Sequence, residues 1–245
     1  MQSTAFPLAP GFGATMSMRR LFITSVLLAG FLAGCQASKP MPTPTLPATS
    51  KTQGIRLPAA RSKGPLSLEE TLLQRRSVRA YTAQPLSLED IAQLFWAAQG
   101  VTRPWGGRTA PSAGALYPLE VYAATAQGVY HYLPDGHCAE VTTQEDVRQA
   151  LWAAGLHQEA LHQAPVIFVI SAVYERTASK YGSRAERYVK LEAGHAAQNL
   201  LLQAVALNLG AVPIGAFDDE AVASALHLPA GEEPLYLIPV GYPAE

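Results

Sequence analysis

The chain has 245 residues, a formal net charge of −1, two cysteines and six histidines. This length is sufficient for a full hydrophobic core, and the nearly balanced charge argues against a nucleic-acid-binding protein. Two cysteines exclude a disulfide framework, and the histidines form no pair of the His-Glu-x-x-His kind. We therefore expect an ordinary globular protein without a protein-bound metal.

The N-terminal residues are typical of an exported bacterial lipoprotein. Arg19 and Arg20 precede an apolar run, residues 21–32, that is too short to span a bilayer comfortably. The run leads into Leu-Ala-Gly-Cys, which resembles a lipobox, so we expect cleavage before Cys35 and lipid on its thiol. The paired arginines also resemble a twin-arginine export signal, with the general secretory route as the alternative. The sequence thus predicts a lipid-anchored protein of the bacterial cell envelope.

The domain organisation follows from this segment and from the prolines after it. Residues 1–34 are upstream residues and signal peptide, and residues 35–55 form a Pro-rich, extended tether. Residues 56–245 form one folded domain.

Two capped helices open this domain. Ser67 and Glu70 have the spacing of a capping box, and Ser87 with Asp90 begins a second helix. The first helix leads into Arg-Arg-Ser-Val-Arg at residues 75–79. Guanidinium groups and a hydroxyl match the oxygens of a phosphate, and a solvated basic turn is the alternative.

A loop rich in Gly, Pro and Arg follows at residues 102–118. It has neither Walker nor dinucleotide-fingerprint spacing. Its small residues lie between Trp105 and Tyr117, so we expect the loop to form one wall of a pocket for an aromatic ring.

The middle of the chain predicts strands and one more helix. Residues 119–124 and 129–132 alternate as a β-hairpin, and the apolar run 165–170 reads as a doubly buried strand. Thr143 is expected to cap a helix that ends near Gly155. The charged residues 174–184 are interpreted as a loop before the next helix.

A long helix is predicted over residues 186–209, with Gly210 as its left-handed cap. One of its faces carries the polar side chains Glu192, His195, Asn199 and Gln203. Buried polar groups need partners, so this face indicates an interface with water or a second chain. A core helix with satisfied polar groups is the alternative.

The residues after this helix predict a short strand, a glycine turn and a helix that begins at Asp218 and Asp219. Gly215 and Ala216 lack bulky side chains, so a flat ligand can reach their backbone N–H groups; an ordinary turn is the alternative. With a last strand at 235–240, helices and strands are interspersed along the chain without an internal repeat. The sequence predicts an α+β domain with a mixed or antiparallel sheet.

Together these motifs resemble the nitroreductase superfamily, and within it the SagB-type dehydrogenases, from Leu66 to Tyr242. The segments that carry the resemblance are 75–79, 110–118, 129–132, 180–184, 192–199 and 213–218. The resemblance implies an FMN-binding fold in which a mixed, mainly antiparallel sheet is packed by helices around a long central helix. It also implies a homodimer with two flavins between the subunits.

The resemblance assigns each motif a part of the flavin. Arg75, Arg76 and Ser77 stand where the family holds the phosphate and ribityl chain, and Arg79 stands where a cation faces the N1–O2 edge. A nearby guanidinium there favours the reduced, anionic flavin. The segment that reaches the flavin from the partner chain corresponds to Pro111, Ser112, Ala113 and Gly114. The backbone beside the flavin atoms N5 and O4 corresponds to Ile214, Gly215 and Ala216.

Azoline oxidases of the SagB type use a Lys-Tyr pair, which Lys180 and Tyr181 match. Such a pair can take the proton that leaves carbon while hydride goes to the flavin, and the alternative is that both are surface loop residues. The expected function is hydride transfer to FMN from a small or peptide-derived, azoline-like substrate. An NAD(P)H-dependent nitroreductase or quinone reductase, and a non-catalytic binding lipoprotein, are the alternatives.

Overall fold

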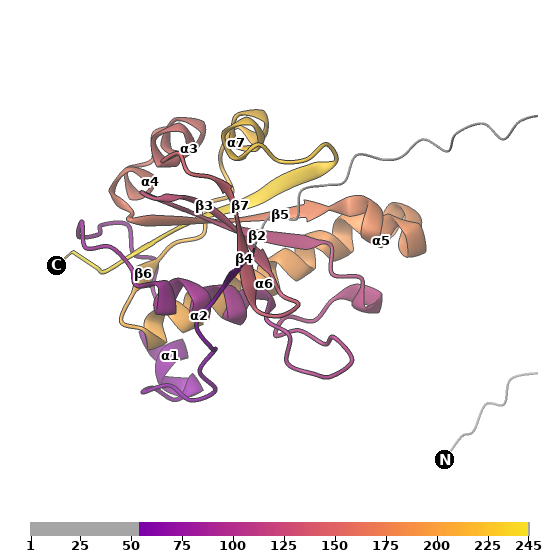
Figure 1. Ribbon diagram of the computed structural model, residues 1–245, viewed down its shortest axis with the longest axis horizontal. Coiled ribbons are helices and arrows are strands. Elements are labelled where there is room, and N and C mark those ends of the chain that lie inside the picture. Colours follow the sequence, from indigo (N-terminus) through magenta and orange to yellow (C-terminus); the bar gives the residue numbers. More distant parts are fainter. Residues whose placement is uncertain (1–53, 245) are drawn as a thin grey trace, which may run out of the picture. The chain divides into compact units, whose positions relative to one another are not determined.

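The computed structural model describes residues 54–244, which build one antiparallel sheet with helices on both faces (Figure 1). The strand order is β1-β4-β3-β2-β5-β7-β6, and each neighbouring pair is antiparallel. The strands are β1 (Ile55–Arg56), β2 (Leu119–Thr125), β3 (Gly128–Leu133), β4 (Cys138–Thr143), β5 (Val166–Val173), β6 (Gly210–Ala211) and β7 (Glu232–Gly241). The α+β prediction is confirmed.

The helices surround this sheet. They are α1 (Leu68–Gln74), α2 (Leu88–Gln99), α3 (Arg148–Ala154), α4 (Glu159–Gln163), α5 (Tyr174–Tyr181), α6 (Ala185–Ala206) and α7 (Asp219–Leu226), with short 3₁₀ turns η1 (Ala113–Ala115) and η2 (Gly182–Arg184). In Figure 1, α1, α2 and α6 lie on one side of the sheet, and α3, α4 and α7 lie on the other.

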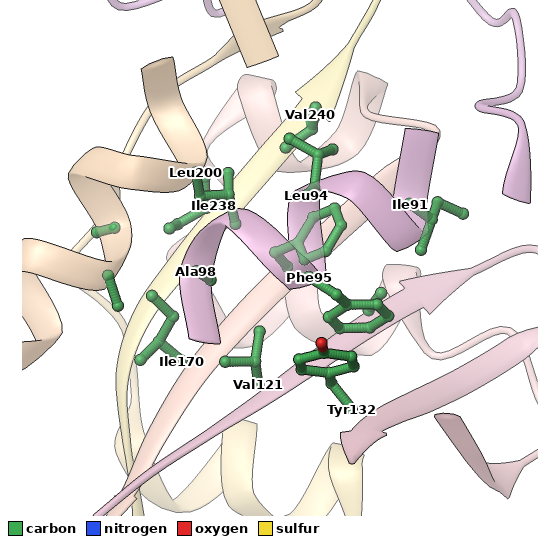
Figure 2. Packing of buried hydrophobic residues seen from close by; sticks show 14 of the residues in the cluster. Ile91, Leu94, Phe95, Ala98, Val121, Tyr132, Ile170, Leu200, Ile238 and Val240 are labelled. Atoms are coloured by element: carbon green, nitrogen blue, oxygen red, sulfur yellow. The ribbon is translucent and has the colours of Figure 1, made fainter. Parts of the chain in front are cut away.

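The larger core cluster lies between the sheet and helices α2 and α6. Phe95 of α2 stacks on Tyr132 of β3, with ring centroids 5.0 Å apart and planes 7° from parallel (Figure 2). Leu200 of α6 joins the same cluster, and so do Val121 and Ile170 on the central strands. Such burial stabilises a domain by about 1.5–3 kcal/mol for each large apolar side chain. The packing fixes α6 as a rigid support.

The helix starts follow the predicted capping. The Ser67 hydroxyl accepts a hydrogen bond from the Glu70 N–H, and the Glu70 carboxylate accepts one from the Ser67 N–H. Ser87 likewise accepts from the N–H of Asp90, and Asp218 caps α7. These predictions are confirmed.

The end of α6 differs from the prediction. The helix stops at Ala206, and the left-handed residue after it is Asn208, with φ 58°. Gly210 belongs to β6, where an added Cβ would stand 2.5 Å from Val78. Gly210 is therefore required by the close approach of another segment and does not cap the helix.

Two further predictions were wrong. Residues 174–184 are not a loop but form α5 and η2, because Tyr174, Thr177, Ala178 and Tyr181 share one helix face and Thr177 is buried. Thr143 does not cap a helix: it ends strand β4, and α3 begins only at Arg148. Strands β1 and β4 and helix α4 were not predicted, and Ile55 of β1 belongs to the segment 35–55 that was predicted as the tether.

The proposed signal peptide, the tether and Cys35 lie outside the described residues. Within residues 54–244, no helix is both long enough and apolar enough to cross a membrane.

Candidate functional site

The arginine-rich segment 75–79 leaves the end of α1 and runs beside β6. Ser77 forms a parallel bridge with Ala211, and the Val78 N–H donates to the Ala211 carbonyl at 3.1 Å. The close approach of Val78 to Gly210 holds the two segments together. The pairing therefore places the arginines next to the strand that continues into residues 214–216.

The side chains of Arg75, Arg76 and Arg79 form no hydrogen bond or ion pair within residues 54–244. Arg75 and Arg76 line a cavity of about 210 Å³ with residues from the C-terminal part of α6, including Val205 and Asn208. Free guanidinium groups around a cavity suit an anion with several oxygens. The Ser77 side chain is exposed beside them.

Residues 214–216 form the second part of this region. Ile214 is held by two hydrogen bonds with Leu237 of β7, whereas Gly215 and Ala216 are exposed. In the described part of the chain, the N–H groups of Gly215 and Ala216 donate no hydrogen bond. A Cβ on Gly215 would meet only the Tyr236 ring, at 4.0 Å, so its surface is open to a flat ligand.

The 111–117 loop lies elsewhere on the chain and is held from within. The Ser112 hydroxyl accepts a hydrogen bond from the Tyr117 N–H at 2.9 Å. The Arg108 guanidinium lies over the Tyr117 ring, 4.4 Å from its centroid. Pro111, Ala113 and Gly114 lie at or near the surface, and Gly114 has φ 65°. Trp105 is exposed and makes no ring contact within the described residues. The aromatic wall expected from this loop stays a prediction.

Lys180 and Tyr181 lie against this loop. A Cβ added to Gly114 would stand 2.9 Å from the Tyr181 hydroxyl and 3.2 Å from Lys180 Nζ. The Lys180 ammonium is 5.6 Å from the centre of the Tyr181 ring. The structure thus brings the Lys-Tyr pair together with the 111–117 loop, on the last turn of α5.

An ionic cluster that the sequence did not reveal holds α5 in place. Arg176 pairs with Glu120 of β2 at 2.5 Å and donates to the Tyr117 carbonyl at 3.1 Å. His131 of β3 is hydrogen bonded to the same carboxylate at 2.8 Å. Burial would raise the pKa of Glu120, but the hydrogen bond with His131 and the charge of Arg176 lower it overall. The sequence did not reveal this cluster for two reasons. Residues 174–184 were interpreted as a loop, and Glu120, the partner of Arg176, lies on a strand that is distant in sequence.

The side chains on the polar face of α6 differ in their hydrogen bonds to other described residues. Asn199 donates to the Thr109 carbonyl at 3.3 Å, and Gln203 accepts from Gln93 at 3.0 Å. His195 is exposed. Glu192 is only 3% exposed, and its Oε1 has no hydrogen-bond partner among the described residues. The core-helix interpretation holds for Asn199 and Gln203 but does not account for Glu192.

The two groups of candidate residues lie at different positions along α6. Residues 205 and 208 border the arginine cavity, whereas Glu192 and Tyr188 line a different cavity with Ser112. At 1.5 Å per residue, Glu192 and Val205 are about 20 Å apart along the helix axis. One chain therefore does not place the 111–114 segment beside the arginine cavity.

Comparison with known proteins identifies the family. The family model described as "Nitroreductase family" matches residues 72–242. The chain belongs to the nitroreductase family. It is 43% identical over 182 residues to "Putative nitroreductase MJ1384" of Methanocaldococcus jannaschii, covering 72% of this chain and 91% of that one.

Two further relatives extend this finding. A crystal structure of a "putative nitroreductase" from Ralstonia eutropha JMP134 superposes with a TM-score of 0.71 and 32% identity, covering 81% of this chain and 94% of that one. The microcin B17-processing protein McbC of Escherichia coli is 29% identical over 140 residues, which is 52% of this chain and 49% of McbC. The nitroreductase part of the resemblance is thereby confirmed.

No cluster of three or more His, Cys, Asp or Glu side chains suited to a metal ion occurs in residues 54–244. Cys138, on β4, forms no disulfide within the same residues.

Proposed function

We propose that this nitroreductase-family chain is an FMN-dependent oxidoreductase. The proposal rests on the guanidinium groups around the 210 Å³ cavity, which have no partner within residues 54–244. Their segment pairs with the strand that leads to two backbone N–H groups, and these also donate no hydrogen bond in that part of the chain. A flavin mononucleotide has both a phosphate for such a cation cluster and a flat ring for an open backbone surface. These guanidinium and backbone N–H donors therefore fit FMN.

Each residue group has a defined task in this proposal. Arg75, Arg76 and Ser77 hold the phosphate through charge-assisted hydrogen bonds, and Arg79 supplies positive charge to the ring. The N–H groups of Gly215 and Ala216 orient the ring by donating to its polar edge. When bound, FMN supplies the two-electron acceptor that takes hydride at N5.

We propose that a second copy of the chain completes the site. The 20 Å separation between the two groups of residues along α6 supports this, because residues 111–114 cannot border the arginine cavity of their own chain. In a homodimer, the segment of one subunit would cover the flavin held by its partner. Lys180 and Tyr181 would accompany that segment, since both lie against Gly114.

Within this chemistry we favour dehydrogenation of a peptide-derived, azoline-like ring, as in SagB-type enzymes. The likeness to McbC, a protein named for processing microcin B17, supports this choice. The position of Lys180 and Tyr181 beside the 111–117 loop also supports it, because a base must stand where the substrate meets the flavin.

A second candidate is reduction of nitroaromatics or quinones with NAD(P)H. The 43% identity to "Putative nitroreductase MJ1384" favours it. Anaerobic titration separates the two candidates. NADPH would bleach the flavin of a reductase directly, whereas a thiazoline-containing peptide would bleach the flavin of an azoline dehydrogenase.

The visible spectrum of the purified protein is the first test. We expect a yellow protein that releases FMN on denaturation. Colourless protein that cannot be reconstituted with FMN would falsify the proposal and favour a non-catalytic binding lipoprotein.

We also propose that the protein is tethered to an envelope membrane through lipid on Cys35. The order of basic residues, apolar run and lipobox supports this proposal. A Cys35→Ser variant should lose lipid labelling and membrane fractionation. Replacement of Arg19 and Arg20 by lysine should leave flavin-loaded precursor in the cytoplasm if export is by the twin-arginine route.

A further inference from the structure

Glu192 is a buried carboxyl group that the proposed flavin chemistry does not yet use. It lies in the middle of α6 and is 3% exposed, and its Oε1 has no hydrogen-bond partner within residues 54–244. A buried carboxylate without an ion pair is costly. Burial of this kind favours the protonated, neutral form of a carboxyl group.

The surroundings of Glu192 connect it to the site. It lines a cavity of about 250 Å³ whose other walls include Ser112, Tyr188 and His195. The Ser112 hydroxyl already accepts the Tyr117 N–H, so its own proton is available for another acceptor. Ser112 lies two positions before Gly114, the residue that contacts the Lys-Tyr pair.

The burial of Glu192 places its titration near neutral pH. Burial raises the pKa of Glu192 to about 7, while the Ser112 hydroxyl and the positive charge of Arg108 act in the opposite direction. Tyr188 and His195 line the same cavity from α6, and the Tyr181 ring packs edge-on against the Tyr188 ring, with centroids 5.1 Å apart. Burial also lowers the pKa of Arg108, although the negative charges of Glu120 and Glu192 act to raise it.

We propose that Glu192 is a proton relay of the flavin site, taking up through the Ser112 hydroxyl the proton that leaves the substrate. The proposal rests on the proposed function. Oxidation of a thiazoline ring to a thiazole breaks two bonds to hydrogen. One hydrogen leaves as hydride to the bound flavin, and the other leaves as a proton to the Lys180–Tyr181 pair. That proton passes to Ser112 Oγ, which donates its own proton to the Glu192 carboxylate; the resulting acid releases it into the cavity beside His195.

Because Glu192 acts through Ser112, it is a positioning residue and not a catalytic one. Its carboxylate form accepts the proton, so the rate of substrate oxidation should rise with pH through about 7. A purely structural carboxyl group would affect stability or flavin affinity without producing this pH step.

The first measurement requires no substrate. Infrared difference spectra of the flavin-loaded protein, recorded across pH 5–9, should show a protonated carboxyl band that disappears near pH 7. The band should be absent in Glu192→Gln. It should remain in Glu186→Gln, the same change on an exposed residue of the same helix, where Glu186 pairs with Lys190.

The second measurement is stopped-flow reduction of the bound flavin by a short synthetic peptide that carries one thiazoline ring. Wild type and Glu186→Gln should show the same rise in rate with pH. Glu192→Gln should lack the rise and should be slower at pH 8 by about ten- to a hundred-fold, which is less than the loss of a direct base. Glu192→Asp should restore part of the pH step. Should Glu192→Gln fail to fold, Ser112→Ala serves instead, keeping the infrared band and losing the pH step.

Two results overturn the relay. An unchanged pH profile in Glu192→Gln or Ser112→Ala shows that the carboxyl group only supports the loop. A wild-type protein that binds no flavin, or whose flavin the thiazoline peptide does not reduce, overturns the proposed function and the relay with it. That failure is recognised separately, because the infrared titration of Glu192 is recorded without the peptide and can be repeated on protein without flavin.

Discussion

Gly114 lies directly against Tyr181: a Cβ added to Gly114 would stand 2.9 Å from the Tyr181 hydroxyl. The family resemblance assigns the 111–117 loop to the flavin of the partner subunit, and it assigns Lys180 and Tyr181 to proton removal. The contact between Gly114 and Tyr181 joins these two groups. Gly114 also adopts φ 65°, a backbone conformation that favours glycine. Both the loop and the Lys-Tyr pair therefore depend on the absence of a side chain at this position.

Gly114→Ala should displace Lys180 and Tyr181 and slow substrate-driven reduction of the flavin. Displacements of about 1 Å at a site can cost about a hundred-fold in rate. The matched control is Gly231→Ala, which has φ 85° and no atom within 4 Å of the added Cβ. Both variants carry similar backbone strain, so equal rates in stopped-flow experiments would contradict a special role for the Gly114 contact.

Lys180→Ala and Tyr181→Phe should each slow reduction of the flavin by substrate by about two to four orders of magnitude, as expected for loss of a general base. FMN affinity and reoxidation by an artificial acceptor should stay near wild type, because the proposed phosphate contacts come from the distant arginine cavity. Lys190→Ala is the control, since Lys190 is an exposed lysine on α6 paired with Glu186. Near-normal reduction rates in both variants would leave the pair as ordinary surface residues.

Arg76→Ala should weaken FMN binding. A hydrogen bond to a charged group contributes about 1.5–3 kcal/mol, which corresponds to a loss of about ten- to a hundred-and-fifty-fold in affinity. Fluorescence titration of the apoprotein with FMN measures this loss. Arg103→Ala, on the exposed loop before the 111–117 segment, should bind FMN like wild type. Equal affinities in the two variants would remove Arg76 from the phosphate site.

The sequence predicted those parts of the fold whose signals are local. The Ser67 capping box and the apolar run in β5 depend on neighbouring residues, and both predictions were confirmed. Helix α5 was missed because its apolar face is short and is built from Tyr174, Thr177, Ala178 and Tyr181 among charged residues. The missed signal was their helical spacing.

Contacts between segments that are distant in sequence were harder to predict from the sequence. Gly210 has the spacing of a helix cap, but contact with Val78 determines its place in β6, and this contact joins segments distant in sequence. The motif resemblance named Ser112 without indicating that a buried carboxyl group lies behind it. The burial of Glu192 and its unpartnered oxygen result from packing of the whole domain.

Glu120→Gln should destabilise the domain by about 1–3 kcal/mol at neutral pH, because it weakens hydrogen bonds between charged groups. The pKa of Glu120 is lowered in the folded state, so its contribution is present above the unfolded value of about 4.3. It is lost as pH falls through the folded value. The difference in unfolding free energy between wild type and variant should therefore shrink from pH 7 to pH 3.

Urea denaturation at each pH measures this difference. Glu145→Gln, at an exposed carboxyl group before α3, should show little effect at any pH. A constant difference between wild type and Glu120→Gln across the pH range would show that the ionic cluster with Arg176 and His131 does not stabilise α5.

Leu191→Asp tests whether two copies of the chain share each site. Leu191 is 54% exposed on α6 beside the Ser112 cavity, where a subunit interface would cover it. A buried, unpaired charge there is costly, so sedimentation should shift from dimer to monomer and FMN affinity should fall with it. Leu156→Asp is the control, because Leu156 is 61% exposed and follows α3 in the chain, a helix on the side of the sheet opposite α6 (Figure 1). A monomeric variant that still binds FMN tightly would rule out the shared site, because residues 111–114 of a second chain would then contribute nothing to the flavin.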